Sequence, residues 1–377
     1  MRLHAIGLGG AGCRIVDRVV ADHDDDPFLQ GAVAFDTDAD ALDALRHLDD
    51  DRRYRFGDAA GGDGLGGDLH AGRRLGSAHA SELGRVLDDE QPSLADAFLL
   101  VVGLGGAAGA GVAPAFAEEL DRLYDAPTYA FGVLPARGET ESRTTDTRRG
   151  RAEEPPRRPL ADKNAARTLD ALSDRLDAVF AFDNDLWLRA DETVGDAIPR
   201  LNAAIAERVA ALFGAGESPD DVSTPQQVLD ASDVARAVGS DGEIAAIGYA
   251  KQAVERPDSG SRFGLGLLGS AEPADVDTSE AVSAIETTIR KAARGKGTIE
   301  VPDGRADRTL LVVGGPPEWL NREAIADGRR WLTTETGSDA ILSGDAPVPD
   351  GDAVFAVVLR SGIDPTERLV ELRESIE

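Results

Sequence analysis

"VVGLGGAAGAG", residues 101–111, places five glycines and three alanines directly after two valines. The preceding run is apolar from Ala97 onward, which is typical of a strand buried on both faces. The following run, "VAPAFAEELDRLY", has the apolar spacing of a helix. A turn of small residues between strand and helix leaves backbone amides unpaired at the positive end of the helix dipole. The stretch therefore predicts a binding loop for an anion, above all phosphate.

Two further glycine-rich loops precede this one. A strand expected at residues 2–7 runs into "GLGGAGCRIVDRVV", where helical spacing takes over, and "GGDGLGGDLHAG" occupies residues 61–72. Glycine suits such loops because a β-carbon would hold the backbone away from phosphate oxygens and forbid positive φ. Tight helix–strand packing by small residues would explain any one loop, but it explains three together poorly.

Strand and helix patterns alternate along the first half of the chain. "GAVAFDTDADALDAL" predicts a strand to Phe35 and a helix start at Asp36–Asp38, since Asp and Thr accept hydrogen bonds from N-terminal amides. "PTYAFGVLP" and "LDAVFAFDN" predict two more strands. We therefore expect an α/β fold with an N-terminal, doubly wound, mostly parallel sheet.

The second half begins with a long helical pattern at residues 193–213, about 30 Å of helix, in which Pro199 should cause a kink or mark the true start. Strands are expected at "GEIAAIGYA", "RFGLGLLG", "RTLLVVGG" and "DAVFAVVLRSG", with helices at 278–294 and 319–334. The predicted units are a nucleotide-binding domain at 1–192, a central helix at 193–214 and a second α/β domain at 215–377.

Residues 140–162, "TESRTTDTRRGRAEEPPRRPLAD", stand apart in composition. They contain six arginines, three prolines and almost no large apolar side chain. This composition predicts a flexible surface insertion. Its positive charge could contact an anionic ligand or an acidic neighbour, or the segment could be a solvated loop.

Charge and cysteine content exclude several classes of protein. The 377 residues carry 40 basic and 69 acidic side chains, a net charge of −29 with only four lysines. An acidic, lysine-poor surface indicates adaptation to concentrated salt, as in halophilic proteins, because salt screens the repulsion between carboxylates. It also argues against nucleic-acid binding, which needs a basic surface for contacts with phosphate. No apolar run reaches the ~18 residues of a membrane span, and the single cysteine, Cys13, excludes a disulfide framework and a multi-cysteine metal site. We expect a cytoplasmic protein with no metal site of its own.

The first loop alone permits another interpretation. Gly7, Gly9 and Gly12 fit G-x-G-x-x-G, and Asp36 lies where a dinucleotide-binding fold places its ribose acid, so an NAD(P)-dependent oxidoreductase is an alternative. A second anion loop at 103–111 would be redundant in that fold, whereas two loops can grip a triphosphate. No G-x-x-x-x-G-K-[ST] occurs, which excludes a P-loop nucleotide-triphosphatase.

Taken together, these motifs resemble the tubulin and FtsZ superfamily and, within it, the archaeal CetZ family. "GLGGAGCR", "FDTDADAL", "GLGGD" and "GLGGAAGAGVAP" are similar to its phosphate and signature loops. "LPARGE", "NAARTLDAL", "FDNDLW" and "GPPEWLNREAIADGRRWL" look like CetZ sequence. The resemblance implies a tubulin/FtsZ-like fold and a GTP-binding cytoskeletal protein that influences cell shape.

The resemblance also implies a nucleotide site. Glu139 would bond the ribose, Asn184 and Asn202 would read the guanine edge, and Ile198 would cover the base. The phosphates would be wrapped by two loops, consisting of Gly9, Gly10, Ala11, Gly12, Cys13 and Arg14, and of Gly105, Gly106, Ala107, Ala108, Gly109, Ala110 and Gly111.

Catalysis in the resembled family is shared between subunits, and "VLDASDVARAV" is similar to its catalytic segment. Asp230 and Asp233, in a loop near 228–234, would orient water in the nucleotide site of the next subunit, with Mg²⁺ on the phosphates. Both aspartates could instead cap the helix that begins there. Because the nucleotide site and the catalytic loop would lie on different faces of the subunit, the resemblance implies a head-to-tail filament of this chain or of related tubulin-like proteins. We expect no binding to nucleic acid and no insertion into a membrane.

Three departures from the family pattern weaken the case for fast hydrolysis. Ala108 and Ala110 replace hydroxyl residues, Val228 replaces an asparagine, and the third loop lacks two residues near Asp68. Each lost hydroxyl contact would cost about 0.5–3 kcal/mol of binding. The sequence thus predicts GTP binding with slow, assembly-dependent hydrolysis, and it leaves open a hydrolysis-deficient regulator or copolymer partner.

Overall fold

The computed structural model describes residues 1–57, 62, 64–88, 90–140, 158–217, 229–240, 242–255, 277–338 and 340–376. The strand expected at "RFGLGLLG", most of the arginine-rich insertion and Val228 lie outside these residues.

The first six strands form a parallel sheet in the order β3-β2-β1-β4-β5-β6. They span β1 Leu3–Leu8, β2 Leu29–Asp36, β3 Arg53–Arg55, β4 Ala97–Gly103, β5 Thr128–Leu134 and β6 Ala178–Asp183. The chain leaves β1 toward β2 and returns to β4 on the other side of β1. This reversal makes the β1–β4 boundary the switch point, where doubly wound sheets bind ligands.

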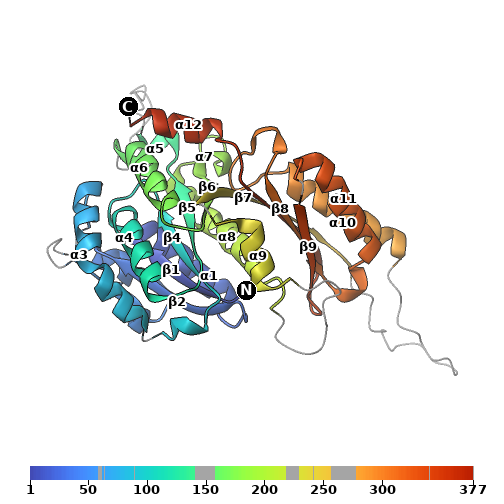
Figure 1. The fold of residues 1–377 in the computed structure, drawn as a ribbon, viewed down its shortest axis with the longest axis horizontal. Coiled ribbons are helices and arrows are strands. Elements are labelled where there is room, and N and C mark those ends of the chain that lie inside the picture. Colours follow the sequence, from blue (N-terminus) through green and yellow to red (C-terminus); the bar gives the residue numbers. More distant parts are fainter. Residues whose placement is uncertain are drawn as a thin grey trace.

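The second half extends the same sheet. Its strands are β7 Glu243–Ala253, β8 Arg308–Gly315, β9 Ala340–Pro347 and β10 Ala353–Ser361. β7 pairs with β6 in parallel and with β10 antiparallel, and the order continues β7-β10-β8-β9. The ten strands of the described residues therefore form one continuous sheet, and the predicted α/β fold with a second α/β unit is confirmed (Figure 1).

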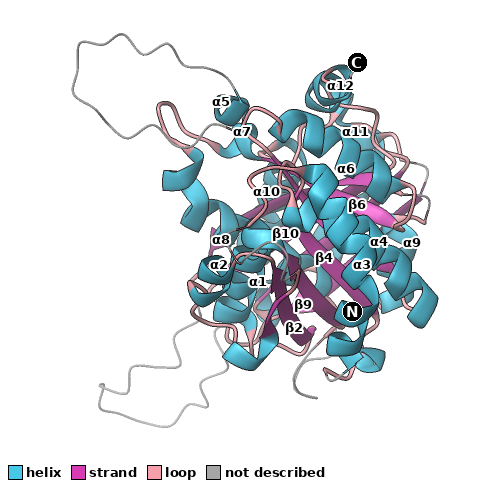
Figure 2. Cartoon of the chain, turned by 90° about the vertical axis from the view of Figure 1, so that its left-hand side faces the viewer, coloured by secondary structure: helices cyan, strands magenta, loops and turns pink. Residues whose placement is uncertain are grey.

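Helices cover both faces of the sheet (Figure 2). Apolar side chains of α1, α8 and α9 pack on one face, and those of α3, α4, α6 and α12 on the other. Two more, α10 and α11, cover β8 and β10. The α-helices span α1 Gly9–His23, α2 Ala39–Asp43, α3 Leu69–Asp88, α4 Ala108–Leu123, α5 Arg137–Thr140, α6 Ala161–Ser173, α7 Asn184–Trp187, α8 Val194–Phe213, α9 Ala231–Val238, α10 Thr278–Arg294, α11 Arg322–Thr336 and α12 Glu367–Glu374.

The central helix α8 crosses the molecule from edge to edge. Thr193 caps it by accepting a hydrogen bond from the amide of Asp196, so Pro199 lies inside the helix, and of the two alternatives for this proline the one that it marks the helix start is wrong. At its other end, the Met1 amino group donates to the carbonyl of Phe213 at 3.0 Å, beside the start of β1. Since the carboxyl ends of β1–β6 lie at the opposite edge, α8 connects the two edges over about 30 Å. None of the described helices is long and apolar enough to cross a membrane.

Candidate phosphate and nucleotide site

Two helices begin immediately after strands at the switch point. α1 starts at Gly9, directly after β1, and α4 starts at Ala108, five residues after β4. Neither helix has a side-chain cap, and α6 also lacks one, whereas α2, α7, α8, α9, α10, α11 and α12 each have one. The first amides of α1 and α4 thus lack a side-chain acceptor, and an anion at this edge would supply one.

Several glycines of the two loops are needed for packing. A Cβ on Gly12 would lie 1.9 Å from the carbonyl oxygen of Val101, and a Cβ on Gly109 would lie 2.0 Å from that of Leu8. Gly9 has φ +71°, and a Cβ there would lie 2.7 Å from the amide nitrogen of Gly109. The two loops therefore interlock through their backbones, and tight packing explains these three glycines.

Gly10 and Gly106 are less confined. A Cβ on Gly106 would meet only the carbonyl of Gly103 at 3.2 Å and the Arg158 guanidinium at 3.9 Å. A Cβ on Gly10 would meet Arg14 Nη1 at 3.2 Å and Asp36 Oδ2 at 3.5 Å. Each of these two glycines therefore has an arginine as a neighbour, so the loops combine free backbone with positive charge.

Two arginines, Arg14 and Arg158, lie close enough at these loops for their positive charges to interact. Arg14 is exposed and has no carboxylate within ion-pair distance among the described residues, while Arg158 pairs with Glu139 at 3.1 Å. Desolvation by the surrounding protein lowers the pKa of Arg14; Cys13 and Asp36 oppose this lowering, and Arg158 adds to it through charge repulsion. Two neighbouring guanidinium groups in a strongly acidic protein create a local preference for an anion.

Asp36, at the end of β2, brings a carboxyl group to the same place. It is 3% exposed, and its Oδ1 accepts hydrogen bonds from the amides of Thr37 at 2.7 Å and Asp38 at 3.4 Å. Burial raises its pKa to about 6 despite these bonds. Asp38 caps α2 by accepting from the amide of Ala41, which agrees with the predicted helix start.

Asn164, on α6, holds the loops together, a role that sequence reasoning missed. Its side-chain amide donates to the carbonyls of Gly67, Gly105 and Gly106 at 3.0, 3.5 and 3.2 Å. Gly67 belongs to the third glycine-rich loop, so one buried asparagine joins that loop to the signature loop. Asn164 belongs to "NAARTLDAL", a stretch identified from the sequence only as similar to CetZ sequence. That similarity was the only indication in the sequence that this residue could be functional.

The predicted base and ribose residues lie on neighbouring elements. Glu139 is on α5, Asn184 begins α7 after β6, and Ile198 and Asn202 are in the first half of α8. Arg200 Nη1 donates to the carbonyl of Trp187 at 3.1 Å and so ties α8 to α7. The side-chain amides of Asn184 and Asn202 form no hydrogen bond within the described part of the chain. Glu139, by contrast, accepts from the Ala136 amide as well as pairing with Arg158.

The predicted catalytic aspartates lie at the opposite edge of the sheet from these loops. They follow α8 and form a capping box on α9: Asp230 accepts from the Asp233 amide at 2.9 Å, and Asp233 from the Asp230 amide at 3.4 Å. Asp233 also pairs with Arg236 at 3.1 Å. The capping role considered from the sequence is therefore present, and one chain does not bring these aspartates to its own phosphate loops.

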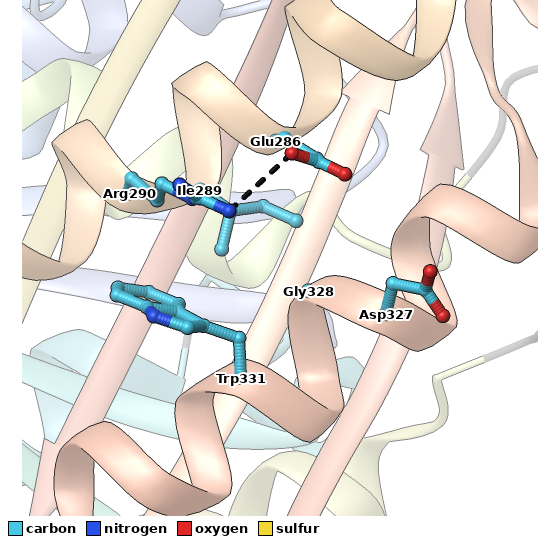
Figure 3. Close-up of a pocket in the computed structure, with 6 residues that line it drawn as sticks. All are labelled: Glu286, Ile289, Arg290, Asp327, Gly328 and Trp331. Carbon is cyan, nitrogen blue, oxygen red and sulfur yellow. Dashed lines mark hydrogen bonds and ion pairs between the residues drawn. The ribbon is translucent and has the colours of Figure 1, made fainter.

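A recess between α10 and α11 is too small for a nucleotide (Figure 3). It measures about 50 Å³, against the roughly 300–1,000 Å³ of ligand pockets. A Cβ on Gly328 would lie 2.3 Å from Ile289 Cδ1, so this glycine allows α10 and α11 to pack closely beside the recess. Arg290 and Trp331 flank it (Figure 3). No group of three or more His, Cys, Asp or Glu side chains in the described ranges could hold a metal ion.

Known families match both halves of the chain. Residues 2–153 match the Tubulin/FtsZ family GTPase domain, and residues 191–377 match the tubulin-like CetZ C-terminal domain. The chain is 34% identical to the tubulin-like protein CetZ5 of Haloferax volcanii, over 100% of this chain and 91% of CetZ5. The chain belongs to the CetZ family. CetZ1 of the same organism is also 34% identical, over 99% of this CetZ chain and 91% of CetZ1.

Solved CetZ structures have the same fold as this CetZ chain. The GDP-bound CetZ1 monomer of Haloferax volcanii has a TM-score of 0.82 at 30% identity, covering 100% of this chain and 98% of CetZ1. CetZ2 from that organism, a GTPγS-bound protofilament, has a TM-score of 0.79 at 28% identity, covering 100% and 97%. An empty FtsZ dimer from M. jannaschii shares the fold at 20% identity, with a TM-score of 0.66 and coverage of 96% and 88%.

Proposed function

We propose that this CetZ-family protein binds GTP between the loops after β1 and β4, assembles head to tail, and hydrolyses GTP slowly at the subunit interface. Its role would be cytoskeletal, in cell-shape control in the cytoplasm. The observation that carries the proposal is the convergence of two uncapped helix N-termini at the switch point, beside Arg14 and Arg158. CetZ1 with GDP and CetZ2 as a GTPγS-bound protofilament support the choice of nucleotide and of assembly.

The chain's own groups account for recognition. The amides of the loops 9–14 and 105–111 would bind phosphate oxygens, with Arg14 and Arg158 balancing charge. The free amides of Asn184 and Asn202 offer a donor and an acceptor to guanine, and Ile198 would cover its face. Glu139 would bond the ribose with the carboxylate that also holds Arg158.

Hydrolysis would need two copies of the chain. Asp230 and Asp233 lie at the edge opposite the phosphate loops, so they can serve only the site of the next subunit in a head-to-tail row. Asp230 accepts its bonds through Oδ1, so its Oδ2 can still accept a hydrogen bond from water, whereas Asp233 uses one oxygen for the Asp230 amide and the other for Arg236. When bound with the nucleotide, Mg²⁺ would offset charge on the phosphates.

A hydrolysis-deficient regulator or copolymer partner is the second candidate. Ala108 is half-buried at the start of α4, so a hydroxyl missing there is missing from the loop surface. Ala110 is completely buried, which makes its missing hydroxyl less important for a ligand. The hydroxyl contact missing at Ala108 would weaken phosphate binding, but the backbone amides of the loop remain available.

Phosphate release from GTP, measured over a range of protein concentration in potassium chloride with Mg²⁺, tests the proposal. We expect activity per subunit to rise with concentration, together with pelleting. Asp230→Asn and Asp233→Asn should lower activity while keeping the helix cap, because asparagine caps as well as aspartate. Asp277→Asn is the control, since Asp277 is also an N-cap aspartate, which accepts from the amide of Ser279 at the start of α10.

Each other outcome selects a different function. GTP binding without turnover at any concentration would replace the GTPase by the regulator. Equal losses in Asp277→Asn would assign the effect to helix capping. Protection against heat by nicotinamide dinucleotides, with no response to guanine nucleotides, would favour the oxidoreductase.

A further inference from the structure

A second cavity lies at the C-terminal end of α10. Its volume is about 600 Å³, within the range of small-molecule pockets, and none of the phosphate-loop residues lines it. Leu186 of α7 supplies one wall, and Ile299, Val301 and Val358 of the second half supply apolar surface elsewhere. The cavity is thus bounded by elements that lie on both sides of the β6–β7 boundary.

Arg360, on β10, lines this cavity without a counter-ion. Its side chain is 8% exposed; Nη2 donates to the carbonyl of Ala293 at 2.5 Å, and Nε has no hydrogen-bond partner. No carboxylate of the described residues lies within 4.0 Å of its guanidinium. Glu335 also lines the cavity and partly offsets the effect of burial on the pKa of Arg360, but Arg294 holds its carboxylate through bonds of 2.6 and 2.7 Å. A buried cation without a paired anion is costly, because burial removes hydration that only a counter-charge replaces.

Lys296 adds a second cation to the same wall. It forms no ion pair within the described part of the chain, and its Nζ lies 5.3 Å from the ring centre of Trp187. Trp187 donates its indole N–H to the carbonyl of Gly297 at 3.0 Å, which fixes the segment beside the cavity. Glu300 and Asp303 also line the cavity, yet neither pairs with Lys296 or Arg360.

We propose that this cavity binds a small organic anion, with a carboxylate or phosphate head on an apolar body. The head would accept hydrogen bonds from Arg360 and Lys296, and the body would contact Leu186 and Val358. Such a ligand would touch both halves of the sheet at once. This site is separate from the proposed GTP site and does not depend on it.

The fluorescence of 1-anilinonaphthalene-8-sulfonate, an apolar ring system with one anionic head, tests the site. It is titrated into the full chain in potassium chloride, with and without GDP. We expect binding that GDP leaves unchanged and that Lys296→Met and Arg360→Met weaken at least tenfold. Arg290→Met is the control, because Arg290 is another cationic residue, on α10, that flanks the separate recess in Figure 3. If Arg360→Met does not fold, Lys296→Glu carries the test and should abolish binding.

Competition then identifies the chemistry of the ligand. Cyclohexanecarboxylate should displace the dye at a concentration at least tenfold lower than cyclohexanecarboxamide, which has the same shape and no charge. Cyclohexyl phosphate in place of the carboxylate distinguishes the two head groups. Equal displacement by acid and amide, loss of dye binding on adding GDP, or an equal loss in Arg290→Met would overturn the proposal.

Discussion

Asp36 links the phosphate loops to pH through a single buried carboxyl group. Its pKa is raised to about 6 because burial disfavours the charged form, although two backbone amides donate to it. The folded state therefore binds this proton more tightly than the unfolded state. The free energy of unfolding should fall as pH rises from about 4 to above 6, by up to about 3 kcal/mol from this group.

Asp36→Asn should remove that pH dependence, because an amide oxygen can accept the same two hydrogen bonds without a charge. We expect the variant to gain stability relative to the native chain as pH is raised from about 4 to about 7.5, by up to about 3 kcal/mol. Denaturant unfolding followed by circular dichroism at several pH values measures the difference. A difference that is constant with pH would assign the cost of Asp36 to something other than its charge.

Arg158 is the second single residue whose contribution to nucleotide binding can be measured by substitution. If it balances phosphate charge, Arg158→Gln should weaken GTP binding by about tenfold, the lower range for a hydrogen bond to a charged group. Arg175→Gln is the control, since Arg175 is exposed just after the end of α6 and donates to the carbonyl of Ala171. Calorimetric titration of both variants gives the ratio. Equal affinities would mean that Arg158 serves only to hold Glu139.

Among the elements, α3 and α4 meet through backbone contacts that glycine makes possible. Cβ atoms added at Gly72 and Gly76 would lie 2.0 Å from the Ala107 carbonyl oxygen and 2.7 Å from Val112 Cα. The sequence predicted residues 61–72 as a loop throughout, but residues from Leu69 onward form the first turn of α3. These glycines therefore belong to helix packing behind the signature loop.

Gly72→Ala should lower the free energy of unfolding by about 1–3 kcal/mol, because the added methyl group meets rigid backbone. Nucleotide affinity should fall with it, since Ala107 lies in the signature loop. Gly138→Ala is the matched change in α5, where an added Cβ would meet nothing within 4 Å, and it should be neutral or slightly stabilising. Thermal unfolding and nucleotide titration of both variants test the pair, and equal effects would contradict the packing account.

Elements with strong local patterns were predicted well, and those held by distant contacts were not. α10 at 278–294 and β8 at 308–315 agree with the predicted bounds. β9 was missed because "AILSGDAP" has turn residues, which an edge strand tolerates. α12 was missed because it is short and polar. It is held by ion pairs from Arg137 to Glu371 and from Arg368 to Asp162, and it lies beside α5 and α6 in Figure 1.

For the whole molecule, net charge decides the conditions under which the fold is stable. Forty basic and 69 acidic side chains repel at low ionic strength, and salt screens that repulsion. We expect the thermal midpoint to rise between about 0.2 M and about 2 M potassium chloride, with each kcal/mol regained raising it by about 2 °C. Circular dichroism measures the midpoint. A flat profile would show that self-repulsion does not limit stability.

The candidate site was predictable where it depends on loop chemistry and unpredictable where it depends on tertiary neighbours. The positions of the two phosphate loops follow from strand–glycine–helix order, which the sequence displays directly. Asn164 and Arg158 reach these loops only because α6 and the end of the insertion fold against them. The sequence offered only the positive charge of the insertion and the CetZ-like stretch around Asn164, so a structure was needed to find which residues reach the loops.

The narrow connection between the two halves of the sheet has a mechanical consequence. β6 and β7 share three register pairs, from Ala178–Glu243 to Phe180–Ala245, whereas β7 and β10 share nine. The β6–β7 ladder is therefore the weaker of these two strand pairings under a tensile load, while the hydrophobic core shared by the two halves and the ion pairs of α12 resist their separation as well. Trp187, bonded to Gly297 across this seam, would bear part of such a load directly.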